Sequence, residues 1–290
     1  MNFIDIVQKK VNSLDVNLWA ELKEKSLQYK KYLNENAITQ IQVKEKVWLL
    51  FGFFADLHFG NIGTDYTTAQ THAEMVGECP YAYGINGGDN IDNFIRTKII
   101  SAIIEAQYTP EQQIKLFQEY VKFFKGKMIL LLGGNHDAWT KAVSGIDWLK
   151  LFAEKNKIVY HPEEIRCVID YGSHNYRFLV KHKTKYNSSF NVTHALKQQY
   201  RMGDWLFDVG VGCHLHTPAL EDCFLQNRHV IVARTGSYKI HDSFGKVQGY
   251  NEAKPIMPCV AVSPHEKRMV SFFHLEEGID FVNFKNRSLK

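Results

Sequence analysis

The sequence has few of the features that mark secreted, membrane-spanning or disordered chains. Its 290 residues include only five cysteines, an odd number without a C-x-x-C pair, which favours reduced thiols over a disulfide framework. Apolar runs such as residues 47–55 and 128–132 are far shorter than the ~20 residues that cross a bilayer. The first residues show no basic segment followed by an apolar one. We therefore expect a cytoplasmic protein without a secretory signal or membrane association.

An excess of charge of one sign is also absent. The formal net charge is +4, far from the concentrated Lys/Arg excess of a dedicated nucleic-acid binder. Hydrophobic residues make up 45% of the chain and charged residues 23%, which is close to the average of globular proteins and excludes disorder as the main state. The mildly basic balance permits an anionic substrate without identifying it.

Two regions of the chain differ in composition. Residues 1–45 are rich in Lys, Glu, Gln and Asn and predict a helical N-terminal extension. The lysines of this extension alternate with glutamates, which is more typical of a solvated helix face than of a DNA-binding segment. Residues 46–290 have the length of one large domain.

The large domain alternates strand-like and helix-like segments, which indicates an α/β fold. The expected strands, several of which could pair antiparallel in a mixed sheet, cover residues 47–55, 127–132, 165–171, 176–181 and 229–234. Helices are expected over residues 109–124, with Pro110 in the first turn, and over residues 146–155. Residues 60–71 and 236–253 are expected to be flexible loops beside the candidate site.

Polar motifs stand at or near the ends of the apolar runs. They are D-x-H, G-D-x-x-D, G-N-H-D, a single histidine and C-H-x-H, which comprise Asp56 and His58, Asp89 and Asp92, Asn135, His136 and Asp137, His182, and His214 and His216. Carboxylates, imidazoles and an amide suit divalent Mn, Fe or Zn. Residues i and i+2 of an extended segment project to the same side, and ligands bind where the strands of an open sheet end. We therefore expect these side chains to converge.

In this order, the motifs resemble those of the calcineurin-like metallophosphoesterases, and the resemblance covers about residues 47–218. One difference is Cys213, which stands where the family usually has Gly before H-x-H. The resemblance implies an α/β fold of two facing β-sheets flanked by helices. It is closest to the repair-exonuclease-like, phosphodiesterase branch in the forms D-L-H-F-G, G-D-x-x-D, G-N-H-D and H-x-H. Asn93 and Asp137 stand where the related protein phosphatases have Arg and Glu, which argues against a protein phosphatase.

The resemblance also implies a role for each motif residue. Two divalent ions are expected, with Mn favoured and Fe, Zn or Ni as other options. One ion would be held by Asp56, His58, Asp89 and His216, and the other by Asp89, Asn135, His182 and His214. Asp89 would bridge the two ions, and the metal-activated hydroxide would attack the phosphate ester. His136 would act as general acid, with Asp137 orienting its ring.

Two of these residues have alternative interpretations. His182 is preferred over its neighbours His161, His174 and His194 because it alone terminates the apolar run 178–180. Asp92 either contacts metal or caps a helix that follows it.

Two further groups lie outside the motifs. Arg234, Tyr238 and Lys239 either bind a substrate phosphate or base, or belong to an ordinary turn with a solvated lysine. The alternating Lys181, Lys183 and Lys185 either line a cleft or protect an exposed sheet edge, and we prefer the sheet edge.

The sequence therefore predicts metal-dependent hydrolysis of phosphodiesters, with DNA or another nucleic acid as the leading substrate. A phosphodiesterase or phosphatase for a small nucleotide, including a cyclic one, is the alternative within enzymes. An interaction module with a vestigial metal site is the alternative from another class. The complete ligand set and His136 argue against that module.

Overall fold

The computed structural model describes residues 16–35, 38–94, 107–241 and 252–287. The chain divides into two compact units, residues 1–39 and 40–290. Helix α2 (Val16–Glu35) lies in the predicted N-terminal extension, but residues Ile38–Gln42 form strand β1, so the expectation of helix is wrong there. Among the described residues, no helix is both long and apolar enough to cross a membrane.

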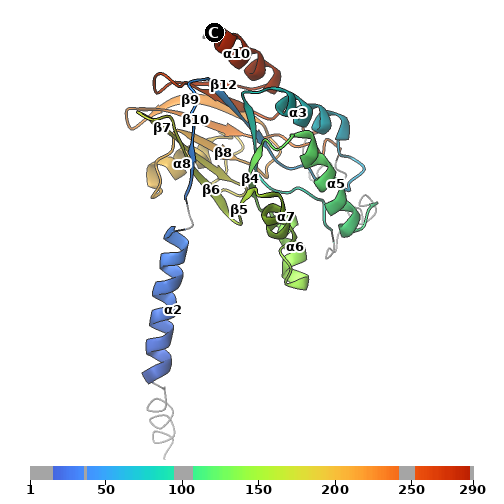
Figure 1. Cartoon of the computed structure of the whole chain (residues 1–290). Coiled ribbons are helices and arrows are strands. Elements are labelled where there is room, and N and C mark those ends of the chain that lie inside the picture. The colour runs from blue at the N-terminus through green and yellow to red at the C-terminus, as the bar shows by residue number, and fades with distance from the viewer. Residues whose placement is uncertain (1–15, 36–37, 95–106, 242–251, 288–290) are drawn as a thin grey trace, which may run out of the picture. The chain divides into compact units, whose positions relative to one another are not determined.

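The fold is built on two six-stranded sheets, each of which contains parallel and antiparallel strand pairs (Figure 1). The order of sheet A is β1, β6 (Glu164–Asp170), β7 (Asn175–Lys181), β8 (Val209–Gly212), β10 (Arg228–Arg234) and β9 (Ala219–Leu225). The order of sheet B is β12 (Met269–Phe272), β11 (Cys259–Val262), β2 (Leu49–Phe54), β3 (Ala82–Asn86), β4 (Met128–Leu132) and β5 (Val159–His161). The predicted fold of two sheets flanked by helices is confirmed.

Strand β2 shows why its sequence is apolar at every position. All six residues are buried, because each face of sheet B packs against another layer. Phe51 and Phe53 point into the core between the sheets, where the ring of Phe51 meets that of Phe178 edge-on at 5.3 Å. Leu50 and Phe54 belong to the core on the opposite face. The strand therefore joins two hydrophobic cores.

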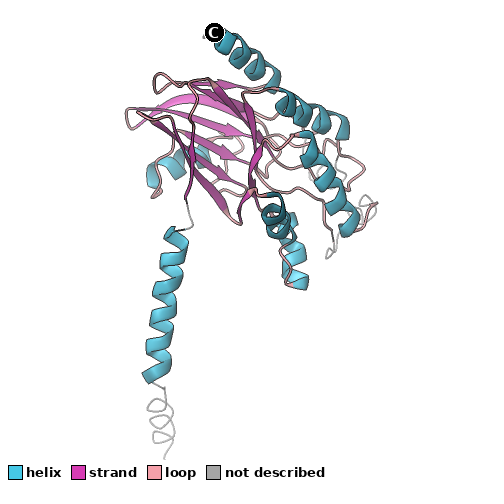
Figure 2. Cartoon of the chain, viewed as in Figure 1, coloured by secondary structure: helices cyan, strands magenta, loops and turns pink. Residues whose placement is uncertain are grey.

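Helices cover the outer faces of both sheets (Figure 2). The core beneath sheet B includes residues of α3 (Tyr66–Glu78), α5 (Pro110–Phe123), α7 (Trp148–Asn156) and α10 (Leu275–Arg287). On sheet A, Leu196 and Tyr200 of α8 (His194–Met202) pack with Leu179, Val230 and Val232. Helix α5 begins as predicted, with Thr109 as its cap and Pro110 in its first turn.

Three local predictions are wrong. The polar G-N-H-D motif after the apolar run 128–132 predicts a loop, but it forms the first turn of a short helix, α6 (Asn135–Ser144). Residues 60–71 are not all loop, because α3 begins at Tyr66. The lysines near 183 do not protect an edge, because β7 pairs with β6 on one side and β8 on the other, and Lys181 forms an ion pair with Glu164 at 2.7 Å. Of the predicted loop 236–253, residues 242–251 lie outside the described part.

Candidate metal centre

The predicted ligands follow strands that end on the same side of the two sheets. In sheet B the parallel strands β2, β3 and β4 end shortly before Asp56, Asp89 and Asn135. In sheet A the parallel strands β7 and β8 end just before His182 and the H-x-H motif. Because the carboxyl ends of parallel strands share one edge, side chains that are up to 160 residues apart in the sequence come together. This convergence is the one that the sequence predicts.

The backbone of these loops differs from the expectation of extended segments. Asp56, His58, Asp89, His214 and His216 adopt left-handed conformations, with φ values of 54°, 48°, 51°, 74° and 56°. This conformation costs an L-residue of this kind roughly 1–2 kcal/mol. Such strain persists where the surrounding structure enforces it and gathers at functional sites. The five residues therefore stand in positions that local stability alone does not favour.

Two glycines allow the loops after β3 and β4 to approach each other. Gly88 has a φ of 93°, and a Cβ atom there would lie 2.8 Å from the Gly134 backbone. A Cβ atom at Gly134 would lie only 2.1 Å from Asp89 N and 2.2 Å from Asp89 Oδ1. The close contact lets the backbone N–H of His136, in the first turn of α6, donate to Asp89 Oδ1 at 2.8 Å.

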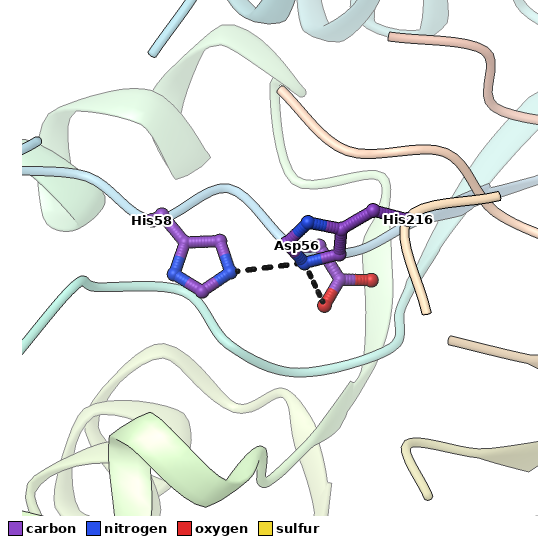
Figure 3. A group of neighbouring side chains, drawn as sticks. All are labelled: Asp56, His58 and His216. Atoms are coloured by element: carbon purple, nitrogen blue, oxygen red, sulfur yellow. Dashed lines mark hydrogen bonds and ion pairs between the residues drawn. The ribbon is translucent and has the colours of Figure 1, made fainter. Parts of the chain in front are cut away.

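Asp56, His58 and His216 form the first group of potential ligands (Figure 3). His216 Nε2 lies 3.4 Å from Asp56 Oδ1 and 3.3 Å from His58 Nε2, so one oxygen and two nitrogens face a common point. The other Asp56 oxygen accepts a hydrogen bond from the backbone N–H of His214 at 2.9 Å. The carboxylate is thereby fixed with its free oxygen toward both imidazoles.

Asp89, His182 and His214 form a second group of potential ligands. Asp89 Oδ2 lies 3.1 Å from His182 Nε2 and 3.9 Å from His214 Nδ1. Asn135 Oδ1 is 3.1 Å from the same nitrogen of His182. His182 Nδ1 donates to the carbonyl of Gly87 at 2.8 Å, which leaves Nε2 to face the carboxylate and the amide. His58, Asp89 and His136 form a third group that lies between the other two.

The buried carboxylates require positive charge nearby. Asp56 Oδ1 and Asp89 Oδ2 are buried, and within the described residues neither has a partner with hydrogen-bond geometry. Burial opposes ionisation of Asp89, but the charges of His182 and His136 hold the pKa of its carboxyl well below the usual value. Burial also opposes protonation of His182, yet Asp89 raises the pKa of that imidazole to about 9. The donor set of oxygens and imidazole nitrogens fits divalent cations, which would take over this charge balance.

Asp92 supports the first ligand group. Its carboxylate lies 3.2 Å from His58 Nδ1 and accepts a hydrogen bond from Asn61 Nδ2 at 2.9 Å. Lys239 Nζ is 3.4 Å from the same carboxylate. A carboxylate that holds the rear nitrogen of an imidazole fixes the ring and directs its other nitrogen toward the ligand group. The cap interpretation requires a helix after Asp92, and residues 95–106 lie outside the described part.

Asp137 does not orient His136 as the resemblance implied. Its carboxylate accepts hydrogen bonds from Gly134 N and from the backbone and side chain of Asn90, at 3.0 to 3.3 Å. Burial, with the nearby charge of Asp89, raises the pKa of Asp137 to about 7. The residue therefore ties together the loops after β3 and β4.

The ring of His136 is oriented by a backbone carbonyl instead. Its Nδ1 donates to Asp92 O at 2.6 Å, and its Nε2 lies 3.9 Å from Asp89 Oδ2. Burial lowers the pKa of His136 to about 4. The ring therefore carries its proton on Nδ1 and turns an unprotonated Nε2 toward the ligand groups.

The three predicted substrate-binding residues are buried. Arg234, which is 1% exposed, donates to the carbonyls of Val192 and Cys213 and to Thr184 and Asn187. Tyr238 shares a hydrogen bond of 2.8 Å with His72. The prediction that Arg234 and Tyr238 face substrate is wrong, because their polar groups are used inside the protein. Lys239 is also not a solvated lysine, since its ammonium lies beside Asp92.

The structure separates His182 from the alternative histidines. His161 ends β5, His174 contacts the carbonyl of Ser263, and His194 begins α8. None of the three belongs to a ligand group among the described residues. Although Cys213 stands where the family usually has Gly, both His214 and His216 belong to groups of potential ligands.

Sequence reasoning missed the aromatic neighbours of His136. The ring of Trp139 lies 4.1 Å from that of His136, and the ring of Phe94 lies 5.1 Å from it, measured between centroids. His136 and Trp139 are three residues apart on α6, so they share one helix face. The helical spacing could have indicated this pair, whereas the contact with Phe94 depends on the tertiary structure.

No protein-family model matches the chain, and no curated protein sequence matches it. Some solved structures do match. A metallophosphoesterase from Sphaerobacter thermophilus is 10% identical, with 83% of this chain and 97% of that chain covered and a TM-score of 0.38. The sulfate thiohydrolase SoxB of Thermus thermophilus is 9% identical, with 85% of this chain and 61% of that chain covered and a TM-score of 0.41. These values are too low to support an argument about function.

Proposed function

We propose that the protein is a dinuclear metal-dependent phosphoesterase of the calcineurin-like type, which hydrolyses phosphodiester bonds in nucleic acid. The observation that carries the proposal is the position of Asp89. Its carboxylate is buried, belongs to one ligand group with His182 and His214, and belongs to another with His58 and His136. A carboxylate placed between ligand groups is what a bridged pair of ions requires.

The residues that we assign to the ions are those whose potential ligand atoms, oxygens and imidazole nitrogens, lie close together. Asp56, His58, Asp89 and His216 would hold one ion, and Asp89, Asn135, His182 and His214 would hold the other. A pair of divalent ions at this position supplies an activated water and positive charge for the phosphate oxygens. Manganese is the ion we favour, and iron, zinc and nickel suit the same donors.

His136 is the candidate general acid. Its Nδ1–H is fixed by Asp92 O, so Nε2 is the nitrogen available to protonate the leaving oxygen. The pKa of about 4 leaves this nitrogen unprotonated at neutral pH. The negative charge of a bound phosphate acts in the opposite direction to burial and favours the protonated imidazole that a general acid needs.

The centre is accessible to solvent on one side. The side chains of His214 and His216 are 35% and 25% exposed, whereas Asp56 and Asp89 are almost fully buried. Substrate is therefore expected to approach from the side of the H-x-H motif. A small nucleotide would need a compact pocket beneath residues 236–253, of which 242–251 lie outside the described part.

The proposal is tested by treating the protein with a chelator and then adding Mn²⁺ back. Hydrolysis of bis-p-nitrophenyl phosphate in preference to p-nitrophenyl phosphate is expected, and it should depend on the metal. His216→Ala should lose this activity, whereas His229→Ala should keep it, because His229 pairs with Asp222 away from the ligand groups. A preference for the monoester, or full activity in His216→Ala, would contradict the proposal.

The substrate class is tested with oligonucleotides and cyclic nucleotides at equal Mn²⁺. Cleavage of oligonucleotides is expected. Rapid turnover of cyclic nucleotides without any oligonucleotide cleavage would instead favour the small-nucleotide alternative. Two bound ions without hydrolysis of any phosphoester would favour the interaction module.

A further inference from the structure

The loop after strand β7 exposes two aromatic side chains close to the candidate metal centre. This loop, residues 183–192, begins directly after His182 and ends before α8. Tyr186 is 68% exposed and Phe190 is fully exposed, at 101%. Large apolar rings usually lose water contact on folding, so two in one short loop are unusual. Two exposed rings in one loop offer flat apolar faces on which a ligand can stack.

The post-β7 loop is held in place by a buried arginine. Arg234 Nε donates to Val192 O at 2.6 Å, and Nη2 donates to Thr184 Oγ1 at 2.7 Å and to Asn187 Oδ1. Thr184 and Asn187 also bond to each other, at 2.7 and 2.8 Å. The buried guanidinium thus fixes both ends and the middle of the loop. A fixed loop presents its exposed rings without a large loss of conformational entropy on binding.

The charge of the post-β7 loop is entirely positive. Residues 183–192 contain Lys183 and Lys185 and no acidic residue. Both lysines are exposed, and neither forms an ion pair with another described residue. Lys181, just before the loop, is in contrast paired with Glu164. Two lysines without an ion-pair partner among the described residues, in the same short loop as two exposed rings, suit a ligand that has both phosphates and flat apolar groups.

The post-β7 loop lies close to the candidate metal centre because few residues separate it from His182. Lys185 and Tyr186 are three and four residues after His182, so their Cα atoms lie within roughly 11 and 14 Å of its Cα atom even in an extended chain. His182 Nε2 itself is 3.1 Å from Asp89 Oδ2. A strand that occupies the centre therefore reaches the loop within a few nucleotides.

We propose that the post-β7 loop is a binding surface for single-stranded nucleic acid, with bases stacked on Tyr186 and Phe190 and backbone phosphates beside Lys183 and Lys185. Stacking requires unpaired bases, because the faces of bases inside a duplex are covered by their neighbours. The inference deepens the proposed function, on which it rests for the chemistry of the centre. Arg234 supports this surface from within without touching the ligand.

Equilibrium binding tests the inference directly. The metal-loaded protein is titrated into a fluorescein-labelled, phosphorothioate-linked oligothymidylate of about 12 nucleotides, a length within the usual site range, and anisotropy is followed. Tyr186→Ala and Phe190→Ala should each weaken binding roughly 5- to 150-fold, the range expected for loss of one stacked base. The matched control is Phe224→Ala, which removes an equally exposed ring, 78% accessible, from strand β9.

The lysines are tested through the salt dependence of the same titration. Lys183→Gln combined with Lys185→Gln should reduce the slope of log K against log salt by about 1.4, since each phosphate contact on a single strand contributes about 0.7. Circular dichroism and thermal unfolding of each variant check that the fold is intact. The inference would be overturned if all loop variants bound the oligothymidylate as tightly as Phe224→Ala does. A preference for a duplex of equal length over the single strand would also overturn it.

Failure of this inference can be distinguished from failure of the proposed function. Hydrolysis of bis-p-nitrophenyl phosphate without loop-dependent oligonucleotide binding would leave the phosphoesterase and remove the loop as the substrate surface. Loop-dependent binding without hydrolysis of any diester would support the loop as a binding surface and contradict the proposed phosphoesterase activity. Absence of any binding of the oligothymidylate to the wild-type protein would also overturn the inference.

Discussion

Replacing Gly134 with alanine tests whether close contact between the loops after β3 and β4 sets the position of Asp89. The φ of Gly134 is −97°, which any residue can adopt, so the effect of the substitution is steric. The new Cβ atom would lie 2.2 Å from Asp89 Oδ1, about 1.2 Å closer than ordinary contact, and 2.1 Å from Asp89 N. Because the nearest atoms include backbone, a rotation of one side chain cannot relieve the clash.

The expected displacement of Asp89 is therefore on the order of 1 Å. A misplacement of this size in a catalytic site can lower the rate about 10²-fold. Overpacking should also lower the free energy of unfolding by about 1–3 kcal/mol. The rate is measured with bis-p-nitrophenyl phosphate and Mn²⁺, metal content by elemental analysis, and stability by urea denaturation.

Gly126→Ala is the matched control. Gly126 has a φ of 81°, and a Cβ atom there would meet nothing within 4 Å. This substitution should cost roughly 1–2 kcal/mol of stability through backbone strain, without a change in rate. If Gly134→Ala keeps the wild-type rate and metal content, the contact does not position Asp89 and the reasoning is refuted.

Four further predictions concern the centre. His136→Ala should keep its metal while the rate falls by roughly 10²–10⁴, the range of general acid catalysis, and loss of metal by elemental analysis would remove the general-acid assignment. Asp89→Asn should weaken the binding of both ions in calorimetric titrations. Tight binding of two ions by this variant would contradict the bridging role of Asp89. Asp92→Asn should weaken metal binding roughly 10- to 100-fold, because the support of His58 Nδ1 is lost, and unchanged calorimetric affinity would contradict this role. Mn²⁺ at 100 times its dissociation constant should stabilise the protein by about 2.7 kcal/mol, and His216→Ala should show a smaller shift in thermal unfolding.

The order of motifs predicted the ligand set because it depends on residue type and on strand ends. Each ligand follows a run whose side chains are buried, and such a run is easy to recognise in a sequence. Asp56, Asp89, Asn135 and His182 are examples, and the structure brings them together with the two histidines of the H-x-H motif. The roles of these residues in holding metal remain predictions.

The orientation of the side chains could not be predicted in the same way. Asp137 and Arg234 looked available for chemistry because an acidic or basic residue beside a motif gives no indication of its burial. In the structure, Asp137 accepts hydrogen bonds from Gly134 and Asn90, and Arg234 holds the post-β7 loop. A buried charged side chain must pair with polar groups that lie near it in the folded structure, and these groups can be distant in the sequence.

The sequence by itself determined the alternation of strands and helices and the residue types that gather at the strand ends, because hydrophobic patterning and motif chemistry are local properties. The arrangement of the strands in two facing sheets was implied only by the resemblance to the calcineurin-like metallophosphoesterases. The tertiary structure alone decided which groups face one another. It set the left-handed backbone of five motif residues, gave Asp92 rather than Asp137 the contact with His136, and left Tyr186 and Phe190 exposed. These features depend on packing between segments that only the folded chain brings into contact.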